Sequence, residues 1–243
     1  MTQTNTVLFI SDLHLDAERP ETIERFVEFS ETRALQAREL YILGDLFEAW
    51  IGDDEDDRRL AVVIQTLQRL TAAGVGCAVM HGNRDFLLGE RFAAATGCRL
   101  LAEFERIELG GEPVLLTHGD LLCSDDVRYL TLRATLRDPH WQREFLDKPL
   151  AERRAIAADL RRMSATEIAA KPEDIMDVNQ GTVEATMRRF EVARLVHGHT
   201  HRPAIHRFML DGHAATRLVL GAWHERASVA SWSDARGFTL QEL

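Results

Sequence analysis

The stretch VLFISDLHLD, residues 7–16, joins a short apolar run to a polar Asp-x-His motif. Residues 7–11 are rich in β-forming side chains and predict a buried strand. Asp12 and His14 follow where that strand would end. Because side chains alternate along an extended segment, we expect Asp12 and His14 to point to the same side. The stretch therefore predicts a strand that delivers a carboxylate and an imidazole to one place.

The same design recurs through the first 120 residues. Further apolar runs predict buried strands at 40–44, 75–82 and 113–119. Between the strands, residues 21–35 and 56–74 carry apolar side chains at helical spacing. The acidic run at 53–57 lacks the spacing of a calcium loop, and we interpret it as a solvated helix start. Strands alternating with helices predict an α/β core that contains parallel strands.

The second half of the chain has a different rhythm. Residues 121–170 lose the strand pattern and become helical, arginine-rich and aromatic, and a further helical stretch follows at 173–192. The remaining apolar runs alternate in the manner of antiparallel strands, at 193–198, 203–210, 215–223, 226–232 and 237–243. We therefore expect an inserted helical element followed by a β-rich end.

Composition excludes several classes of protein. The chain has 243 residues and a net charge of -10, so we expect one globular domain and no nucleic-acid partner. The cysteines at 77, 98 and 123 are few and widely spaced, which favours packing roles in a reducing compartment. No apolar run reaches the roughly 18 residues that span a bilayer, and no signal peptide is recognised. We expect a cytoplasmic protein.

Every predicted strand of the core ends in an oxygen or imidazole donor. Ligands collect outside the carboxyl ends of strands in open α/β sheets, so these side chains can meet in space. Seven donors exceed the need of one ion, whereas two ions bridged by a shared carboxylate would use them all. The donors are Asp12, His14, Asp45, Asn83, His118, His199 and His201.

The donor types narrow the choice of metal. Imidazole, carboxylate and amide without thiolate suit Mn²⁺, Fe²⁺, Co²⁺ or Zn²⁺. Any one of these residues alone would more commonly be a cap or turn residue, but the ordered set favours a metal site. His197 falls inside the predicted strand rather than after it, and we expect it to have a structural role. No partner spacing singles out the histidines at 81, 140, 206, 213 and 224.

The ordered motifs D-x-H, G-D, G-N-R-D, T-H-G-D and G-H-T-H resemble the calcineurin-like metallophosphoesterase superfamily. The segments YILGDLFEAWIGDD, HGNRDFLLG, THGDLLCSDD, IMDVN and VHGHTHRPAIH further resemble its UDP-2,3-diacylglucosamine pyrophosphatase branch, bacterial enzymes of lipid A biosynthesis. The resemblance implies an α/β four-layer αββα sandwich of two facing sheets. It also implies one domain over residues 1–243, with a helical lid insertion at about 121–170, and two Mn²⁺ ions.

The resemblance also implies an activity, the hydrolysis of UDP-2,3-diacylglucosamine to 2,3-diacylglucosamine 1-phosphate (lipid X) and UMP. Hydroxide would attack the α-phosphorus at a pair of metal ions. Asp12, His14, Asp45 and His201 would hold one ion. Asp45, Asn83, His118 and His199 would hold the other.

Catalytic and substrate-binding residues follow from the same resemblance. Asn83, Arg84 and His118 are the expected catalytic residues. Many superfamily members carry histidine in place of Arg84, and our hypothesis is that Arg84 stabilises developing phosphate charge. The implied substrate contacts are Asn83, Arg84, Asp126, Tyr129, Arg161, Ser164, Lys171 and His199.

The predicted insertion carries a local excess of positive charge. Residues 128–162 contain eight arginines and one lysine against five acids. Apolar residues beside them could form a lid over acyl chains at the cytoplasmic face of the inner membrane. Alternatively, the apolar residues only pack the insertion onto the core and the arginines are solvated. No protein partner is inferred.

Two other functions stay open. A metal-dependent phosphodiesterase or phosphatase with a small soluble substrate would keep all seven donors. A non-catalytic interaction module on the same fold would be expected to have lost some of them.

Overall fold

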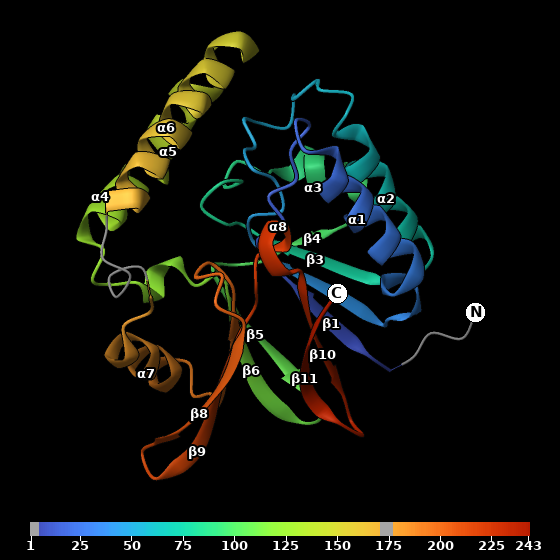
Figure 1. The fold of residues 1–243 in the computed structure, drawn as a ribbon, viewed down its shortest axis with the longest axis vertical. Coiled ribbons are helices and arrows are strands. Elements are labelled where there is room, and N and C mark those ends of the chain that lie inside the picture. The colour runs from blue at the N-terminus through green and yellow to red at the C-terminus, as the bar shows by residue number, and fades with distance from the viewer. Residues whose placement is uncertain (1–4, 171–176) are drawn as a thin grey trace.

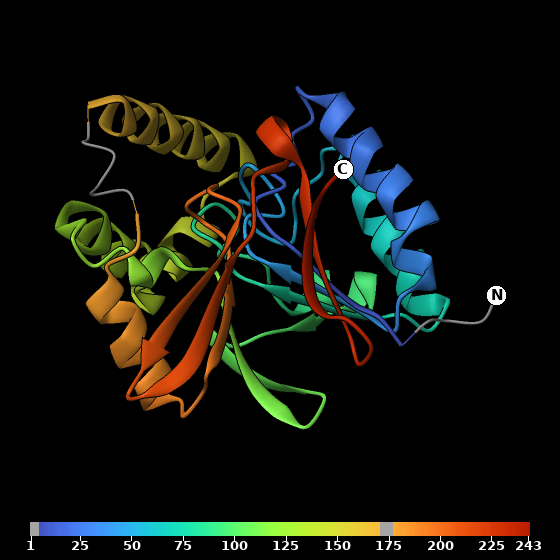
Figure 2. The same ribbon diagram turned by 60° about the horizontal axis from the view of Figure 1, so that its bottom comes forward.

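Two mixed β-sheets lie face to face at the centre of the molecule (Figures 1 and 2). The computed structural model describes residues 5–170 and 177–243. The first sheet has the order β11-β10-β1-β2-β3-β4, and its β1 to β4 run parallel. Its strands are β1 (Val7–Ile10), β2 (Glu39–Leu43), β3 (Gly76–Met80), β4 (Arg99–Leu100), β10 (Ser228–Ser233) and β11 (Gly237–Glu242). The predicted parallel core is confirmed.

The second sheet has the order β5-β6-β7-β9-β8. Its strands are β5 (Phe104–Leu109), β6 (Glu112–Thr117), β7 (Arg194–His197), β8 (Ala204–Leu210) and β9 (His213–Val219). The antiparallel reading of the last strands is wrong for one pair, since β9 runs parallel to β7 with Leu195 opposite Arg217. The β8–β9 hairpin folds so that its second strand, not its first, continues the sheet.

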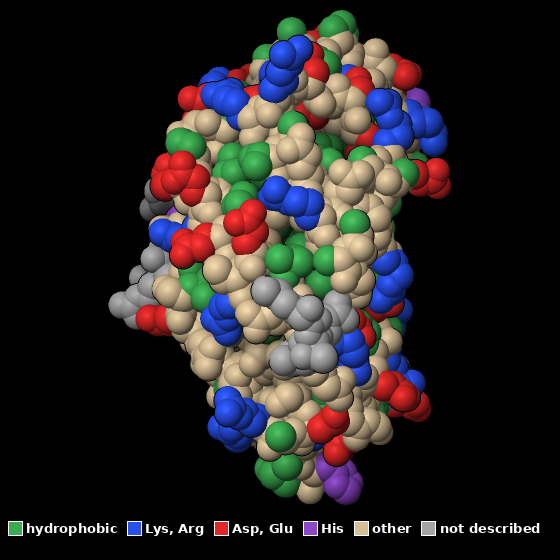
Figure 3. Space-filling model, turned by 90° about the vertical axis from the view of Figure 1, so that its right-hand side faces the viewer, with side chains coloured by type: hydrophobic (Ala, Val, Ile, Leu, Met, Phe, Trp, Pro, Cys, Tyr) green, Lys and Arg blue, Asp and Glu red, His purple; other side chains and the backbone are tan. Residues whose placement is uncertain are grey.

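Helices cover the outer face of each sheet. The first sheet is covered by α1 (Pro20–Thr32), α2 (Ala61–Ala72) and α3 (Glu90–Thr96), with a 3₁₀ turn η1 (Ala34–Gln36) after α1. The second sheet is covered by α7 (Gln180–Arg189). The layers are therefore helix, sheet, sheet, helix, which confirms the predicted αββα fold. On the face beside α1 and α2, charged side chains of both signs lie among apolar ones (Figure 3).

The strand β1 is apolar on both faces because both faces are covered. In β1, Leu8 and Ile10 pack under the helices, whereas Val7 and Phe9 pack against the second sheet. Such a strand has no polar side chain until it leaves the sheet. The first polar residues after β1 are therefore placed at the sheet edge, where the candidate site lies.

Most of residues 121–170 is helical. A 3₁₀ turn η2 (Asp120–Leu122) follows β6, and then come α4 (Val127–Leu136), α5 (Pro139–Leu146) and α6 (Leu150–Ala170). These three helices, called the lid below, stand to one side of the sandwich (Figure 1). Among the described helices, including the short α8 (Trp223–Arg226), none is long and apolar enough to cross a membrane.

The acidic run at 53–57 is not a helix start, which corrects the interpretation from sequence. It forms a loop, and α2 begins only at Ala61. Asp54 pairs with Arg153 of the lid, while Glu55 and Asp56 pair with Arg154. These acidic residues form a loop that contacts the first turn of α6, about 100 residues away in the sequence. Sequence spacing could not indicate this contact.

Candidate metal centre

The seven predicted donors meet at one edge of the two sheets. Asp12 and His14 follow β1, Asp45 follows β2, and Asn83 follows β3 in the first sheet. From the second sheet, His118 follows β6, while His199 and His201 follow β7. The carboxyl ends of parallel strands in both sheets thus supply the donors, as expected from the strand exits.

One group of donors surrounds His14. The Nε2 atom of His14 lies 3.4 Å from Nε2 of His201 and 3.7 Å from Oδ2 of Asp45. Nε2 of His201 lies 3.4 Å from Oδ1 of Asp12. Asp12, His14 and His201 can offer one atom each within 4.8 Å of one another. This spacing suits donors around a shared cation.

A second group surrounds His118. Its Nε2 atom lies 2.9 Å from Oδ1 of Asn83 and 3.8 Å from Oδ2 of Asp45. Nδ1 of His199 lies 3.0 Å from the same Asn83 oxygen. Asp12, Asp45 and His118 also form a group within 4.8 Å. Oδ2 of Asp45 thus lies almost equally far from His14 and from His118, so Asp45 stands between the two groups.

The backbone at the donors is strained, which corrects the reasoning from alternation. Five of the seven donors have left-handed φ angles, namely Asp12 (56°), His14 (48°), Asp45 (52°), His199 (69°) and His201 (56°). Left-handed backbone is uncommon for non-glycine residues and costs about 1–2 kcal/mol each. The paired side chains therefore converge by tight turns rather than by extended alternation. Such strain concentrates at functional sites.

Two glycines let these turns approach one another. A Cβ at Gly82 would overlap the Asp45 carboxylate, and a Cβ at Gly198 would overlap Ser11 Oγ and Asp12 Oδ2. Glycine allows such close approach because it has no Cβ. In the structure the close approach is between donor loops. Larger residues at either position would push the two loops apart.

Hydrogen bonds fix the orientation of the donors. Nδ1 of His118 lies 2.8 Å from Leu43 O, which leaves Nε2 facing Asn83. Nδ1 of His14 lies 3.1 Å from Oε2 of Glu48. Metal-binding histidines typically use their second nitrogen in this way. Neither Leu43 nor Glu48 was expected at the site, because their role depends on contacts between loops.

A buried carboxylate holds the Asp45 turn. Asp85 accepts hydrogen bonds from the backbone N–H groups of Gly82 (2.8 Å), Leu46 (2.7 Å) and Asp45 (3.3 Å). Burial and the nearby Asp45 charge raise the pKa of Asp85 to about 6. Asp85 lies within the HGNRD motif, yet the sequence pattern did not indicate this positioning role.

The pKa shifts of two donors favour cation binding, whereas the nearby carboxylates raise the pKa values of His14 and His118 despite burial. Burial alone would raise the pKa of Asp12, but hydrogen bonding and proximity to His201 hold it well below its ordinary value. Burial, with the His118 charge next in importance, lowers the pKa of His199 to about 4. Carboxylates must be ionised and imidazoles neutral to bind a metal. Asp12 and His199 therefore meet this condition near neutral pH.

One oxygen in the cluster lacks a conventional partner. Oδ2 of Asp12 accepts from Ser11 Oγ (2.7 Å) and His199 N (2.9 Å). Oδ1 is buried and has no well-formed hydrogen bond within the described part of the chain, although Nε2 of His201 lies 3.4 Å from it. Burying a carboxylate oxygen without a hydrogen-bond partner costs free energy unless a cation binds to it. The donor set, with oxygen and nitrogen but no sulfur, fits a divalent metal ion.

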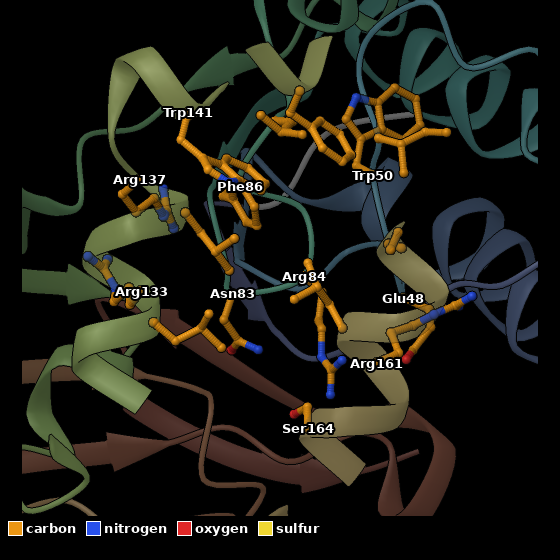
Figure 4. A pocket seen from close by; sticks show the side chains of 18 of the residues that line it. Glu48, Trp50, Asn83, Arg84, Phe86, Arg133, Arg137, Trp141, Arg161 and Ser164 are labelled. Atoms are coloured by element: carbon orange, nitrogen blue, oxygen red, sulfur yellow. The ribbon is translucent and has the colours of Figure 1, made fainter. Parts of the chain in front are cut away.

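A largely apolar hollow opens beside Asn83, between the core and the lid (Figure 4). Arg84 extends into it between Asn83 and Arg161, with its tip toward Ser164 (Figure 4). Its apolar walls include Trp50, Phe86, Leu132, Leu136, Trp141, Phe145 and Leu160. Apolar pockets with a few convergent polar groups are the common form of ligand site.

The predicted substrate contacts fall into three groups. Tyr129, Arg161 and Ser164 line the hollow with Asn83 and Arg84. Asp126 instead caps α4 by accepting from the Tyr129 N–H, 3.1 Å away. Lys171 lies outside the described residues. The ring of Tyr129 lies 5.8 Å from that of His199, so the hollow reaches the donor cluster.

The basic residues of the lid hold it to the core. Arg133 pairs with Asp120 and Glu103, and Arg137 donates to Gly82 O over 2.8 Å. At the start of α6, Arg153 donates to Ile51 O and pairs with Asp54, while Arg154 pairs with its acidic neighbours. Neither free solvation nor phosphate binding describes these four arginines.

His224 is a site residue that sequence reasoning missed. Its ring centroid lies 5.5 Å from that of His14 and 5.6 Å from that of His201, edge-on to both. It lies on α8, far in the sequence from the Asp-x-His and His-x-His motifs, so only the fold brings it to the site. By contrast, His197 lies apart from the donors as expected, with Nε2 3.1 Å from Arg217 and Nδ1 2.8 Å from Gly198 O.

The fold and the site define a class of protein. The profile described as "Calcineurin-like phosphoesterase" matches residues 6–203, which span all seven donors. The chain therefore belongs to the calcineurin-like phosphoesterase family. A solved archaeal phosphodiesterase has the same fold, with a TM-score of 0.52 and 13% identity over 98% of this chain and 99% of its own.

Curated relatives narrow the comparison. A protein of Stenotrophomonas maltophilia (strain R551-3) named "UDP-2,3-diacylglucosamine hydrolase" is 49% identical over 98% of both chains. A protein of Klebsiella pneumoniae subsp. pneumoniae with the same name is 49% identical over 91% of this chain and 92% of its own. The resemblance to this branch, first drawn from the motifs, is confirmed.

Proposed function

We propose that the protein hydrolyses the diphosphate of UDP-2,3-diacylglucosamine to 2,3-diacylglucosamine 1-phosphate and UMP, a step of lipid A biosynthesis. Water attacks the α-phosphorus, its oxygen enters UMP, and the lipid 1-phosphate leaves. The observation that carries the proposal is the apolar hollow that opens directly beside the donor cluster. The names of relatives nearly half identical over almost the whole chain support the same substrate.

The seven donors would hold two Mn²⁺ ions. Asp12, His14, Asp45 and His201 would bind one, and Asp45, Asn83, His118 and His199 the other. The central position of Asp45, between His14 and His118, supports its bridging role. Bound divalent ions would supply a nucleophile at neutral pH and neutralise phosphate charge.

Asn83, Arg84 and His118 would act on the diphosphate. The backbone of Arg84 is fixed, since its N–H donates to Asp45 Oδ1 (2.8 Å) and its carbonyl accepts from Trp50 N (3.1 Å). Its buried Nε has no hydrogen-bond partner among the described residues. A guanidinium with an unpaired donor, carried on a fixed backbone, can therefore stabilise charge that develops on phosphate. Replacing Arg84 with alanine should slow turnover, and a near-full rate would contradict this role.

The two acyl chains would occupy the hollow under the lid. Leu132 and Leu136 of α4, Trp141 of α5 and Leu160 of α6 face it from one side. The phosphate and sugar would lie near Arg84, Tyr129, Arg161 and Ser164, with Asp126 acting by capping α4. We propose that residues 1–243 form one domain, with this lid inserted at about 121–170.

The lid would also meet the cytoplasmic face of the inner membrane. Val127 of α4 and Met163 of α6 are 68% and 62% exposed, and Leu132 and Leu146 of the lid are also exposed. A lipid substrate must leave the bilayer, and an apolar lid surface shortens that path. Replacing Val127 and Met163 with aspartate should reduce binding to anionic vesicles several-fold. Unchanged vesicle binding would remove this part of the proposal.

A small soluble phosphodiester is the less favoured substrate, because its hydrolysis needs no apolar hollow. The experiment uses UDP-2,3-diacylglucosamine, Mn²⁺ or chelator, and ¹⁸O-labelled water, with mass spectrometry of both products. We expect metal-dependent turnover with the label in UMP. Label in the lipid phosphate would contradict attack at the α-phosphorus, and cleavage of only a small phosphodiester would contradict the lipid substrate.

A further inference from the structure

A second hollow borders the donor cluster, and its lining is polar. It is open to solvent. It shares Glu48, Arg84 and Arg161 with the apolar hollow. In Figure 4, Asn83 lies on one side of Arg84, and Glu48 and Arg161 lie on the other. The two hollows therefore meet at Arg84.

The two hollows touch different donors. Asn83 lines the apolar hollow, on the side of His118 and His199. His14 and His201 line the polar hollow. A diphosphate held across the cluster would consequently direct one of its substituents into each hollow.

The charge of the polar hollow favours an anion. Four arginines at 19, 84, 161 and 162 face two carboxylates, Asp16 and Glu48. The carboxylates have partners, since Glu48 lies 3.2 Å from Arg19 and 3.1 Å from His14, and Asp16 lies 3.9 Å from Arg161. Arg162 pairs with Asp159 outside the hollow. Arg84 forms no ion pair within 4.0 Å among the described residues, although its charge helps to lower the pKa of Glu48. The lining therefore suits a phosphate with a polar substituent.

His224 adds an aromatic surface at this hollow. Its ring meets His14 and His201 edge-on, at interplanar angles of 77° and 78°. The residue is exposed, so it can contact a ligand as well as its two neighbours. Exposed aromatic rings beside phosphate-binding groups are typical of nucleotide-binding surfaces, because every base has a face that stacks.

We infer that the polar hollow binds the nucleoside monophosphate half of the substrate, with His224 packing against the nucleoside. The inference rests on the proposed function, which supplies a substrate with a lipid half and a nucleotide half. The apolar hollow binds the lipid half, and the polar hollow binds the nucleotide half. Water attack at the α-phosphorus then releases UMP on the side of His14 and His201.

The test measures product binding by calorimetry in the presence of Mn²⁺, without turnover. The probes are UMP and 2,3-diacylglucosamine 1-phosphate. His224→Ala should weaken UMP binding about tenfold and leave lipid binding within twofold of wild type. Leu132→Ala, a matched change in the apolar hollow, should weaken lipid binding about tenfold and leave UMP binding within twofold of wild type. His224→Phe should restore UMP binding, since stacking needs a ring rather than a nitrogen.

Mn²⁺ affinity, measured on the same samples, separates this role from support of the metal centre. Unchanged UMP affinity in His224→Ala would overturn the inference while leaving hydrolysis by the wild type intact. Equal loss of UMP and Mn²⁺ binding, not restored by phenylalanine, would also overturn it. A wild-type protein that does not hydrolyse the lipid substrate would instead contradict the proposed function.

Discussion

The metal centre and the lid are held in opposite ways. Asp12, Asp45 and His118 are buried and are hydrogen-bonded to residues in or just after other strands, and the backbone of Asp12 and Asp45 is left-handed. In the lid, α4 has no fully buried residue and α5 has only Phe145. Arginine contacts with the core at α4 and at the start of α6 hold the lid in place, together with Phe145 and a few partly buried apolar residues of α5 and α6 that pack on the core.

From this difference we expect the metal centre to perform the chemistry and the lid to select the substrate. Tightly packed turns hold the donors in place, so substitutions that change volume or charge there should reduce activity strongly. A segment with few buried apolar contacts opens at low free-energy cost. We therefore expect the lid to loosen without unfolding the sandwich, and lid variants to affect lipid binding more than turnover of small substrates.

The largest expected effect is at the centre of the metal cluster. Replacing Asp45 with asparagine removes the charge that stands between both donor groups, so kcat/KM should fall by roughly a thousandfold or more. Mn²⁺ content by mass spectrometry should fall below the wild-type value, while circular dichroism stays unchanged. Wild-type metal content in this variant would show that Asp45 does not bridge.

Gly198→Ala should come next. Its Cβ would overlap Ser11 and Asp12, so the two loops must separate. We expect a loss of about 1–3 kcal/mol in unfolding free energy and roughly a hundredfold in kcat. Gly212→Ala is the control, because it has φ of 82° but open space around its Cβ. It should cost about 1 kcal/mol from strain and leave kcat unchanged. Equal effects on kcat would refute the steric explanation.

The lid anchor should give a smaller effect. Arg153 is 3% exposed and donates to Ile51 O and Asp54, whereas Arg154 is 44% exposed and pairs at the surface. Arg153→Ala should raise KM for the lipid substrate about tenfold and destabilise the protein by about 2 kcal/mol. Arg154→Ala should cost less than about 1 kcal/mol. Kinetics with a soluble phosphodiester should be unchanged in both, and a slower soluble reaction would contradict the separation of roles.

The smallest effect concerns pH. Burial and the Arg217 charge lower the pKa of His197 to about 3, from 6.5 in the unfolded chain. Between those values only the unfolded chain binds the proton, so the contribution of His197 to stability is lost as pH falls from 6.5 toward 3. The stability difference between metal-free wild type and His197→Gln should shrink by at most about 1.4 kcal/mol per pH unit. Denaturant unfolding at pH 7, 6 and 5 measures it, and a constant difference would contradict the low pKa.

The comparison also explains what could be predicted from sequence. The seven donors are each placed by a strand just before them, so local patterns were enough to find them. Glu48, Asp85 and His224 act through partners on other loops, and no local pattern announces such contacts. The strands β4 and β5 and helix α3 went unpredicted; β4 has only two residues and α3 only seven, too short for a clear period.

The errors have a common cause as well. The acidic run at 53–57 was assigned from its own composition, although its conformation depends on Arg153 and Arg154. The pairing of β9 with β7 depends on which strand of a hairpin reaches the sheet. Both depend on contacts between distant segments, which periodicity does not encode.

The central claim is that the buried cluster performs hydrolysis while the lid selects the acylated half of the substrate. The most direct test compares kcat/KM for UDP-2,3-diacylglucosamine and for the same molecule without acyl chains, in wild type and in Trp141→Ala. We predict a strong wild-type preference for the acylated substrate that falls at least tenfold in the variant, with turnover of the deacylated compound unchanged. Equal wild-type rates on both substrates would contradict the claim.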